Sequence, residues 1–286
     1  MVNPERLTRL TTARGLDLHC RVWRSRQPTL SVLVLVHGLG EHLGRYDSVA
    51  TALNQAGITV AGFDLPGHGR SAGQRGHINH WQDYRQSLQQ FVTLMATQFP
   101  SAPLFLMGHS LGAMIALDFA MQDWFPLQGL IISGTPLVPT SVQSPIKVLV
   151  VRLLSPIFPR LSLKTGVQPA ALSRDRMLLE RDRQDALIHN VATLRWGAEM
   201  LDAIARIKAN PNKISHPVLM MHGDCDTISA IAGAQTFFDA IPAADKTFNI
   251  YPGSHHEPHN DLDADQVMSD LTDWIKGQTI KTRQIG

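Results

Sequence analysis

The chain has 286 residues, of which 44% are hydrophobic and 17% are charged, and its formal net charge is +2. This composition is typical of a globular protein with one large α/β domain or two smaller ones. The near-neutral charge and the lack of a Lys/Arg run argue against nucleic acid as a partner. Residues 1–12 have no apolar signal-peptide core, and no stretch reaches the roughly 20 apolar residues that span a bilayer, so we expect a cytoplasmic protein.

Neither a metal nor a cofactor is expected. Cys20 and Cys225 lie far apart and match no metal-ligand spacing, so we interpret them as reduced thiols, with Cys225 as a small buried residue. Strand alternation separates the histidine and aspartate residues between 216 and 226, which disfavours a shared metal. The sequence also contains neither a G-x-G-x-x-G fingerprint nor a Walker loop.

The first half of the chain alternates between strand and helix patterns. Residues 6–12 and 16–23 flank a short turn and predict an N-terminal β-hairpin. Apolar runs and helical spacings then predict, in chain order, a strand at 31–37, a helix at 46–55, a strand at 58–65, a helix at 81–98, a strand at 104–107, a helix at 111–122 and a strand at 127–133. Short turns between these elements favour a mostly parallel sheet with helices on both faces.

The alternation stops between residues 137 and 213, where only helical patterns appear, and then resumes. Strands are predicted at 217–222 and 246–251, helices at 228–240 and 262–276, and a frayed polar tail at 277–286. We therefore predict a core with an eight-stranded sheet, made from residues 1–136 and 214–286. Residues 137–213 form a predicted helical lid over the carboxyl edge of the sheet, where open α/β sheets hold their sites.

The most informative motif is Gly108-His109-Ser110-Leu111-Gly112, which joins a predicted strand to a predicted helix. G-x-S-x-G in this context is typical of a nucleophile elbow, where the serine sits on a strained turn and its small neighbours let strand and helix pass closely. We therefore predict Ser110 as a nucleophile. The backbone N–H of Leu111 would then face the oxyanion that develops during acyl transfer.

A serine nucleophile needs a base and an orienting acid, expected in the chain order Ser, acid, His after later strands. Asp224 and Asp226 follow one predicted strand and compete for the role of acid. We prefer Asp226, because Asp224 is placed to form a turn. For the base, after the next strand, we prefer His256, with His255 as its rival and His259 as an outsider.

The second oxyanion donor is expected in the turn His37-Gly38-Leu39-Gly40, which follows the predicted strand at 31–37. The glycines carry no Cβ, so a backbone N–H can approach a substrate closely, and we expect Leu39 to supply it. The alternative is that the two glycines only form a tight turn.

Taken together, these motifs resemble the monoacylglycerol lipase branch of the α/β-hydrolase superfamily over nearly the whole chain. The matching stretches are His37–His42 with Arg45-Tyr46, Gly67–Ser71, the elbow at Ser110, Ser173-Arg174, Gly223–Asp226 and Tyr251–His256. The resemblance implies the α/β-hydrolase fold and a lipid ester as substrate. It also implies Asp226 as the acid and His256 as the base.

The resemblance further implies that Glu41, Arg45 and His259 form a polar pocket around the glycerol or head-group end of the substrate. The chain departs from the family at one place in the lid. Lipases of the family often carry a tyrosine shortly before an Asp-Pro-Leu stretch, whereas this chain has Asp182 before Asp185-Ala186-Leu187.

Residues 146–158 of the predicted lid are mainly apolar and include Lys147 and Arg152. Similar lids in the family line an acyl channel and touch membranes, and an amphipathic cationic segment fits docking at a membrane surface. The same pattern fits a segment that only packs on the sheet.

The leading hypothesis is a serine hydrolase that cleaves monoacylglycerol or a similar single-chain lipid ester through an acyl-Ser110 intermediate. Lysophospholipase, carboxylesterase and thioesterase activities are alternatives that use the same residues. A catalytically silent lipid-binding protein is an alternative of a different class. The complete set of serine, acid and histidine argues against it.

Overall fold

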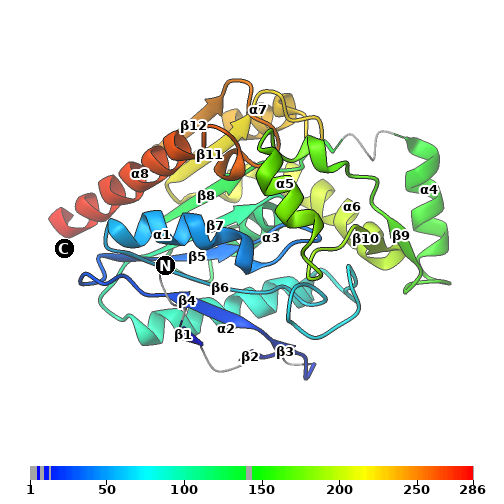
Figure 1. The fold of residues 1–286 in the computed structure, drawn as a ribbon, viewed down its shortest axis with the longest axis horizontal. Coiled ribbons are helices and arrows are strands. Elements are labelled where there is room, and N and C mark those ends of the chain that lie inside the picture. Colours follow the sequence, from blue (N-terminus) through cyan, green and yellow to red (C-terminus); the bar gives the residue numbers. More distant parts are fainter. Residues whose placement is uncertain (1–4, 7–9, 13, 140–143, 286) are drawn as a thin grey trace.

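An eight-stranded sheet forms the centre of the protein in the computed structural model, which describes residues 5–6, 10–12, 14–139 and 144–285. The strand order is β1-β4-β6-β5-β7-β8-β11-β12 (Figure 1). The strands that pair in parallel are β5 (Ser31–Val36), β6 (Ile58–Phe63), β7 (Leu104–His109), β8 (Gly129–Ser133), β11 (Val218–Gly223) and β12 (Lys246–Tyr251). The predicted eight-stranded, mostly parallel sheet is confirmed.

The N-terminal strands are antiparallel to their partners. Strand β1 (Glu5–Arg6) pairs with β4 (Cys20–Trp23), and β2 (Leu10–Thr11) pairs with β3 (Asp17–Leu18). Strand β4 also joins the edge of the sheet by pairing with β6. The predicted hairpin is therefore present, although residues 7–9 and 13 of the prediction lie outside the described residues.

Helices cover both faces of the sheet. Successive side chains of a strand point to opposite faces, so strands that are apolar throughout need cover on each side. All residues of β5 are buried. Leu33 and Leu35 pack with α1 (Asp47–Gln55) and α8 (Ala264–Ile285) on one face. The valines of β5 pack on the other face, in the core that includes α2 (Gln82–Gln98), α3 (Leu111–Ala120) and α7 (Ile231–Ala240). A continuous apolar strand is therefore what this position in the sheet requires.

The last helix is longer than the sequence pattern predicts. Helix α8 continues to Ile285, so the expected frayed tail from residue 277 is wrong for the described residues. The reason is a long-range contact. Gln278 donates to Asp245 Oδ2 at 2.9 Å, and Lys281 Nζ lies 2.6 Å from the same oxygen.

A long inserted segment, residues 137–213, lies between β8 and β11. Its described elements are α4 (Pro145–Leu154), β9 (Ser162–Lys164), η3 (Pro169–Ala171), α5 (Arg176–Arg183), β10 (Val191–Thr193), α6 (Leu194–Lys208) and η4 (Pro211–Lys213). The expectation of a purely helical block is wrong, because β9 and β10 form an antiparallel pair. Strands of three residues are too short to show a period in the sequence. Residues 140–143 lie outside the described part of the chain.

Candidate active site

Ser110 occupies a sharp turn between β7 and α3. Its φ is 51° and its ψ is −116°, a strained conformation for a residue with a side chain. The positions on either side of the serine have no room for a side chain. A Cβ on Gly108 would lie 2.1 Å from Gly112 O, and a Cβ on Gly112 would lie 2.0 Å from Val36 O. The strand thus passes directly into the helix, and the serine side chain stays partly exposed.

Three side chains from distant parts of the chain form one line of hydrogen bonds. His256 Nε2 lies 2.9 Å from Ser110 Oγ, and His256 Nδ1 lies 2.7 Å from Asp226 Oδ2. The histidine follows β12 and the aspartate follows β11, so parallel strands bring both loops to the same edge of the sheet as the elbow. This arrangement can move a proton from the serine to the imidazole.

The aspartate of this line is held from several sides. Its Oδ1 accepts the backbone N–H groups of Ile228 and Ser229 at 2.8 and 2.9 Å, and His222 Nε2 lies 3.1 Å from its Oδ2. No motif in the sequence pointed to this role of His222. The contacts orient the carboxylate of Asp226 toward His256.

The competing residues have other partners. Asp224 Oδ1 accepts the backbone N–H of Gly253 at 2.6 Å, which closes a loop at the surface. The ring of His255 points away from the elbow, with Nδ1 2.9 Å from Ala170 O in the inserted segment. Cys225, which follows Asp224 in the sequence, is exposed, so the expectation of a buried thiol is wrong.

Burial and charge act against each other at His256. Burial, the largest single influence, disfavours the imidazolium, but the carboxylate of Asp226 favours it together with those of Glu257 and Glu41, and the pKa of His256 lies above its ordinary value of 6.5. For Asp226, burial favours the neutral acid, but the contacts with His256 and His222 hold its pKa well below the usual range. The pair can therefore stabilise the protonated imidazole that transfer of the serine proton would form.

The imidazole of His109 packs against that of His256, and the imidazole of His259 packs against that of His109. The ring of His109 lies 5.1 Å from that of His256, and the ring of His259 lies 4.7 Å from that of His109. Burial lowers the pKa of His109 to about 3 and also lowers the pKa of His259, so both rings are neutral at neutral pH. His256 is thus distinguished from them by its carboxylate partner.

The turn after β5 lies directly against the nucleophile. A Cβ on Gly38 would be 3.3 Å from Ser110 Cβ. The Gly38 carbonyl lies 2.8 Å from Nδ1 of His37, whose Nε2 accepts the backbone N–H of Leu65 at 2.9 Å. The donor at Nδ1 therefore orients the planar peptide that carries the Leu39 N–H, the predicted oxyanion donor. The other predicted donor, Leu111, begins α3, where backbone N–H groups have no helical acceptor.

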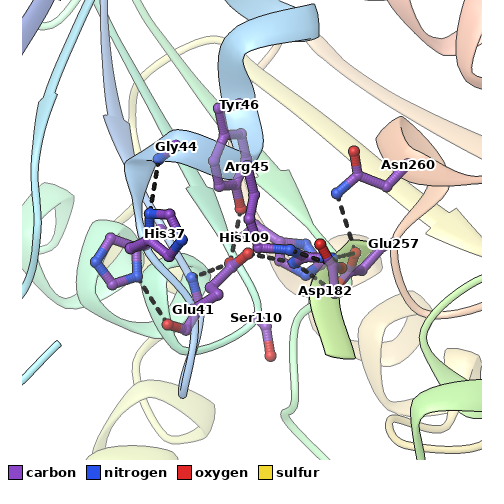
Figure 2. Close-up of polar contacts among 12 residues, drawn as sticks. His37, Glu41, Gly44, Arg45, Tyr46, His109, Ser110, Asp182, Glu257 and Asn260 are labelled. Atoms are coloured by element: carbon purple, nitrogen blue, oxygen red, sulfur yellow. Dashed lines mark hydrogen bonds and ion pairs between the residues drawn. The ribbon is translucent and has the colours of Figure 1, made fainter. Parts of the chain in front are cut away.

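Glu41, Arg45 and His259, the predicted substrate pocket, are all buried. Arg45 contacts the carboxylates of Glu41, Glu257 and Asp182 (Figure 2). His259 stacks on Tyr46 instead, with ring centroids 5.0 Å apart. Contact of these residues with an alcohol stays a prediction.

Sequence reasoning missed Glu257 and Tyr46 in this network. Tyr46 donates its hydroxyl to Glu41 Oε1 at 2.8 Å, and Asn260 Nδ2 donates to Glu257 Oε2 at 3.0 Å. The available signal was the position of Glu257, directly after the preferred base. A buried carboxylate such as that of Glu257 needs a partner of opposite charge.

In the part of the chain that the structure describes, no group of three or more His, Cys, Asp or Glu side chains is placed to hold a metal ion. No helix among those residues has both the length and the apolar character needed to cross a bilayer.

Comparisons with known proteins agree with this architecture. A family model described as "Serine aminopeptidase, S33" matches residues 27–263. The monoglyceride lipase of Rattus norvegicus is 30% identical over 273 residues, which are 94% of this chain and 90% of that protein. An uncharacterized abhydrolase domain-containing protein of Dictyostelium discoideum is 29% identical over 273 residues, and the match spans only 29% of its length.

The solved structures include the monoacylglycerol lipase of Paleococcus ferrophilus. It superposes with a TM-score of 0.82 at 29% identity, over 91% of this chain and 99% of that chain. The fold is therefore the α/β-hydrolase fold. With matches over most of its length, the chain belongs to the Hydrolase_4 family of serine hydrolases and is related to the monoglyceride lipases.

Proposed function

We propose that the protein is a serine ester hydrolase that acts on monoacylglycerol or a similar single-chain lipid ester. The observation that carries the proposal is the unbroken line of hydrogen bonds from Ser110 Oγ through His256 to Asp226. The adjoining glycine turn supports it, because a turn without side chains lets backbone N–H groups approach a carbonyl oxygen. The names of the monoglyceride lipases among the relatives support the substrate class.

In the proposed mechanism, Ser110 Oγ attacks the ester carbonyl while His256 Nε2 takes the hydroxyl proton. Asp226 accepts a hydrogen bond from Nδ1 and stabilises the imidazolium. The backbone N–H groups of Leu39 and Leu111 donate to the oxyanion. When the tetrahedral intermediate collapses, the C–O bond to the alcohol breaks and His256 returns the proton to the leaving oxygen. Water then repeats the cycle on the acyl-serine and releases the fatty acid.

The inserted segment would act as a lid over this site. Its backbone contacts both loops that carry site residues: His189 donates its N–H to Gly40 O at 2.8 Å, and Leu172 O accepts the N–H of Glu257 at 2.9 Å. These contacts support a lid that meets the oxyanion turn at His189 and the histidine loop at Leu172. A boundary between core and lid at residues 136–137 and 213–214 fits this division.

The outer surface of the lid fits contact with a lipid surface. Helix α4 stands at the right-hand edge of the molecule, away from the sheet (Figure 1). It and the turn that follows expose a row of apolar side chains, which are Ile146, Leu149, Leu153, Ile157 and Phe158. Lys147 adds positive charge, whereas Arg152 is paired with Asp202 at 2.8 Å. Replacing Leu149 and Leu153 by serine should reduce sedimentation with anionic phospholipid vesicles while hydrolysis of a soluble ester is retained; undiminished sedimentation would refute docking through α4.

The decisive test of the function uses Ser110→Ala. We expect wild-type protein to hydrolyse 1-monoacylglycerols and to form an adduct with a fluorophosphonate probe, and the variant to do neither. Initial rates on monoacylglycerols of different chain length, lysophospholipids, acyl thioesters and p-nitrophenyl esters then identify the substrate class. Undiminished turnover in the variant would show that another residue is the nucleophile.

A further inference from the structure

The guanidinium of Arg45 is fully occupied by carboxylates. An arginine has five N–H donors, and here each meets a carboxylate oxygen. Nε and Nη2 donate to Asp182 Oδ2 at 3.0 and 2.5 Å, and Nη1 donates to Glu41 Oε2 at 2.5 Å. Nη1 and Nη2 also donate to the two oxygens of Glu257, at 2.9 and 2.7 Å. Figure 2 shows the guanidinium between the three acids.

The three acids belong to three different parts of the site. Glu41 follows the oxyanion turn, Glu257 follows the base His256, and Asp182 lies in α5 of the inserted segment. The side chain of Arg45 is 4% exposed, and those of Glu41, Glu257 and Asp182 are 6%, 3% and 12% exposed. One buried cation therefore connects the inserted segment to both loops that carry the proposed chemistry.

The contact with Glu41 reaches the oxyanion turn itself. The other oxygen of Glu41 accepts the backbone N–H of Gly38 in a short hydrogen bond, and it also accepts the hydroxyl of Tyr46. Gly38 precedes Leu39, the proposed oxyanion donor, and lies against Ser110. Burial would favour the neutral acid, but Arg45 lowers the pKa of Glu41 and keeps it a carboxylate that can accept these bonds.

We infer that Arg45 is a positioning residue that links the inserted segment to the geometry of the oxyanion turn. This inference rests on the proposed function, because it concerns the same oxyanion. Arg45 itself contacts no atom of the line from Ser110 to Asp226. It acts through Glu41, and Asp182 is the part contributed by the lid. Without the contact to Asp182, Arg45 would keep two of its three carboxylates and its hold on Glu41 would change.

A lysine cannot replace Arg45 in this role. It carries the same charge but presents a compact ammonium with three donors, whereas three carboxylates here use five donors in a planar fork. The four groups of the cluster carry three negative charges and one positive charge, so a lost contact with Glu41 or Glu257 leaves a buried carboxylate with less compensation. Arg45→Lys thus separates the geometry of the guanidinium from its charge.

The test uses p-nitrophenyl acetate, a substrate too small to depend on an acyl channel, with rates normalised to active sites titrated by a fluorophosphonate. We expect Arg45→Lys to lower kcat about 10- to 100-fold with KM changed less than about threefold, somewhat less than the cost of losing one oxyanion donor. Asp182→Asn should lower kcat about three- to tenfold, since Arg45 keeps two carboxylates. Adding Asp182→Asn to Arg45→Lys should have no further effect, because in this inference Asp182 acts on the oxyanion turn only through Arg45.

The matched control is Arg206→Gln. Arg206 also joins the inserted segment to the core, through Nε to Asp118 Oδ1 at 2.9 Å in α3, and Arg85 remains to pair with that carboxylate. This variant should lose some thermal stability but keep kcat within about twofold. Titration of active sites removes the effect of misfolded protein, so a purely structural role of Arg45 would leave kcat per site unchanged.

Three results would overturn the inference: unchanged kcat in both Arg45→Lys and Asp182→Asn, an effect confined to KM, or additive effects in the double variant. Failure of the proposed function looks different. In that case the wild-type protein itself would form no fluorophosphonate adduct. If only the inference about Arg45 fails, the wild-type protein is still labelled and only the kinetics of the Arg45 and Asp182 variants differ from the expected values.

Discussion

Gly112 and Gly277 allow the same substitution, glycine to alanine, to be tested with opposite expected outcomes. Both residues lie within helices, Gly112 in α3 and Gly277 in α8. A Cβ on Gly112 would lie 2.0 Å from Val36 O and 2.7 Å from His37 O, whereas a Cβ on Gly277 would have no heavy atom within 4 Å. The elbow therefore has no room for a methyl group, and the last helix does.

The magnitudes follow from these distances. Cβ atoms essentially never come within 3.0 Å of such a neighbour, and the neighbours of Gly112 are backbone atoms, so α3 and β5 would have to separate by about 1 Å. Overpacking of this kind costs about 1–3 kcal/mol, partly offset by about 1 kcal/mol from the higher helix propensity of alanine. A displacement of about 1 Å at the nucleophile can also lower the rate about 100-fold. Gly277→Ala should instead stabilise the protein by about 0.5–1 kcal/mol.

Urea unfolding of the two variants and the wild type, followed by tryptophan fluorescence and circular dichroism, measures the free energies of unfolding. The acylation burst with p-nitrophenyl acetate measures the reactivity of Ser110. Wild-type stability together with a wild-type burst in Gly112→Ala would refute the reasoning that close backbone contact sets the elbow. Destabilisation by Gly277→Ala would show that α8 does not continue through that residue as a helix.

Three further outcomes are expected. Because Asp226 raises the pKa of the base His256, kcat/KM for a soluble ester should fall as the pH drops through a midpoint above 6.5, and a midpoint below that value would contradict the assignment. Asp64 is buried and accepts two backbone N–H groups at 2.9 and 2.8 Å, so Asp64→Ala should lower the free energy of unfolding in urea by about 1–3 kcal/mol; unchanged stability would show that those groups find other acceptors. Asp224 raises the pKa of the exposed Cys225 thiol, so iodoacetamide should alkylate it at pH 7 more slowly than it alkylates Cys225 in an Asp224→Asn variant.

The inference about Arg45 changes how the lid would matter for catalysis. A lid that only covered the site would affect access and binding, and its removal would appear in KM. A lid that supplies Asp182 to a buried guanidinium instead affects the placement of the oxyanion turn, and its effect appears in kcat. Asp182, in the stretch of the lid that departs from the family pattern, thus has a structural partner in Arg45.

The sequence by itself determined the elements that depend on neighbours in the chain. The apolar run at 31–37 predicted a strand buried on both faces, and glycines on either side of Ser110 predicted the tight elbow. Both patterns are local, because strand and helix periods and the space around a turn are set by residues a few positions apart. Order along the chain also predicted that Asp226 and His256 follow two later strands, and the structure brings both into one line with Ser110.

Only the tertiary structure decided between adjacent candidates. His255 and His256 differ by one position, and the direction of the loop after β12 turns one ring toward Ala170 and the other toward Ser110, 146 residues away in the sequence. The extension of α8 beyond residue 276 and the pairing of β9 with β10 likewise depend on partners distant in the chain. Arg45 is the clearest case, since its three acids are close together only because parallel strands end at a common edge and the inserted segment folds back over it.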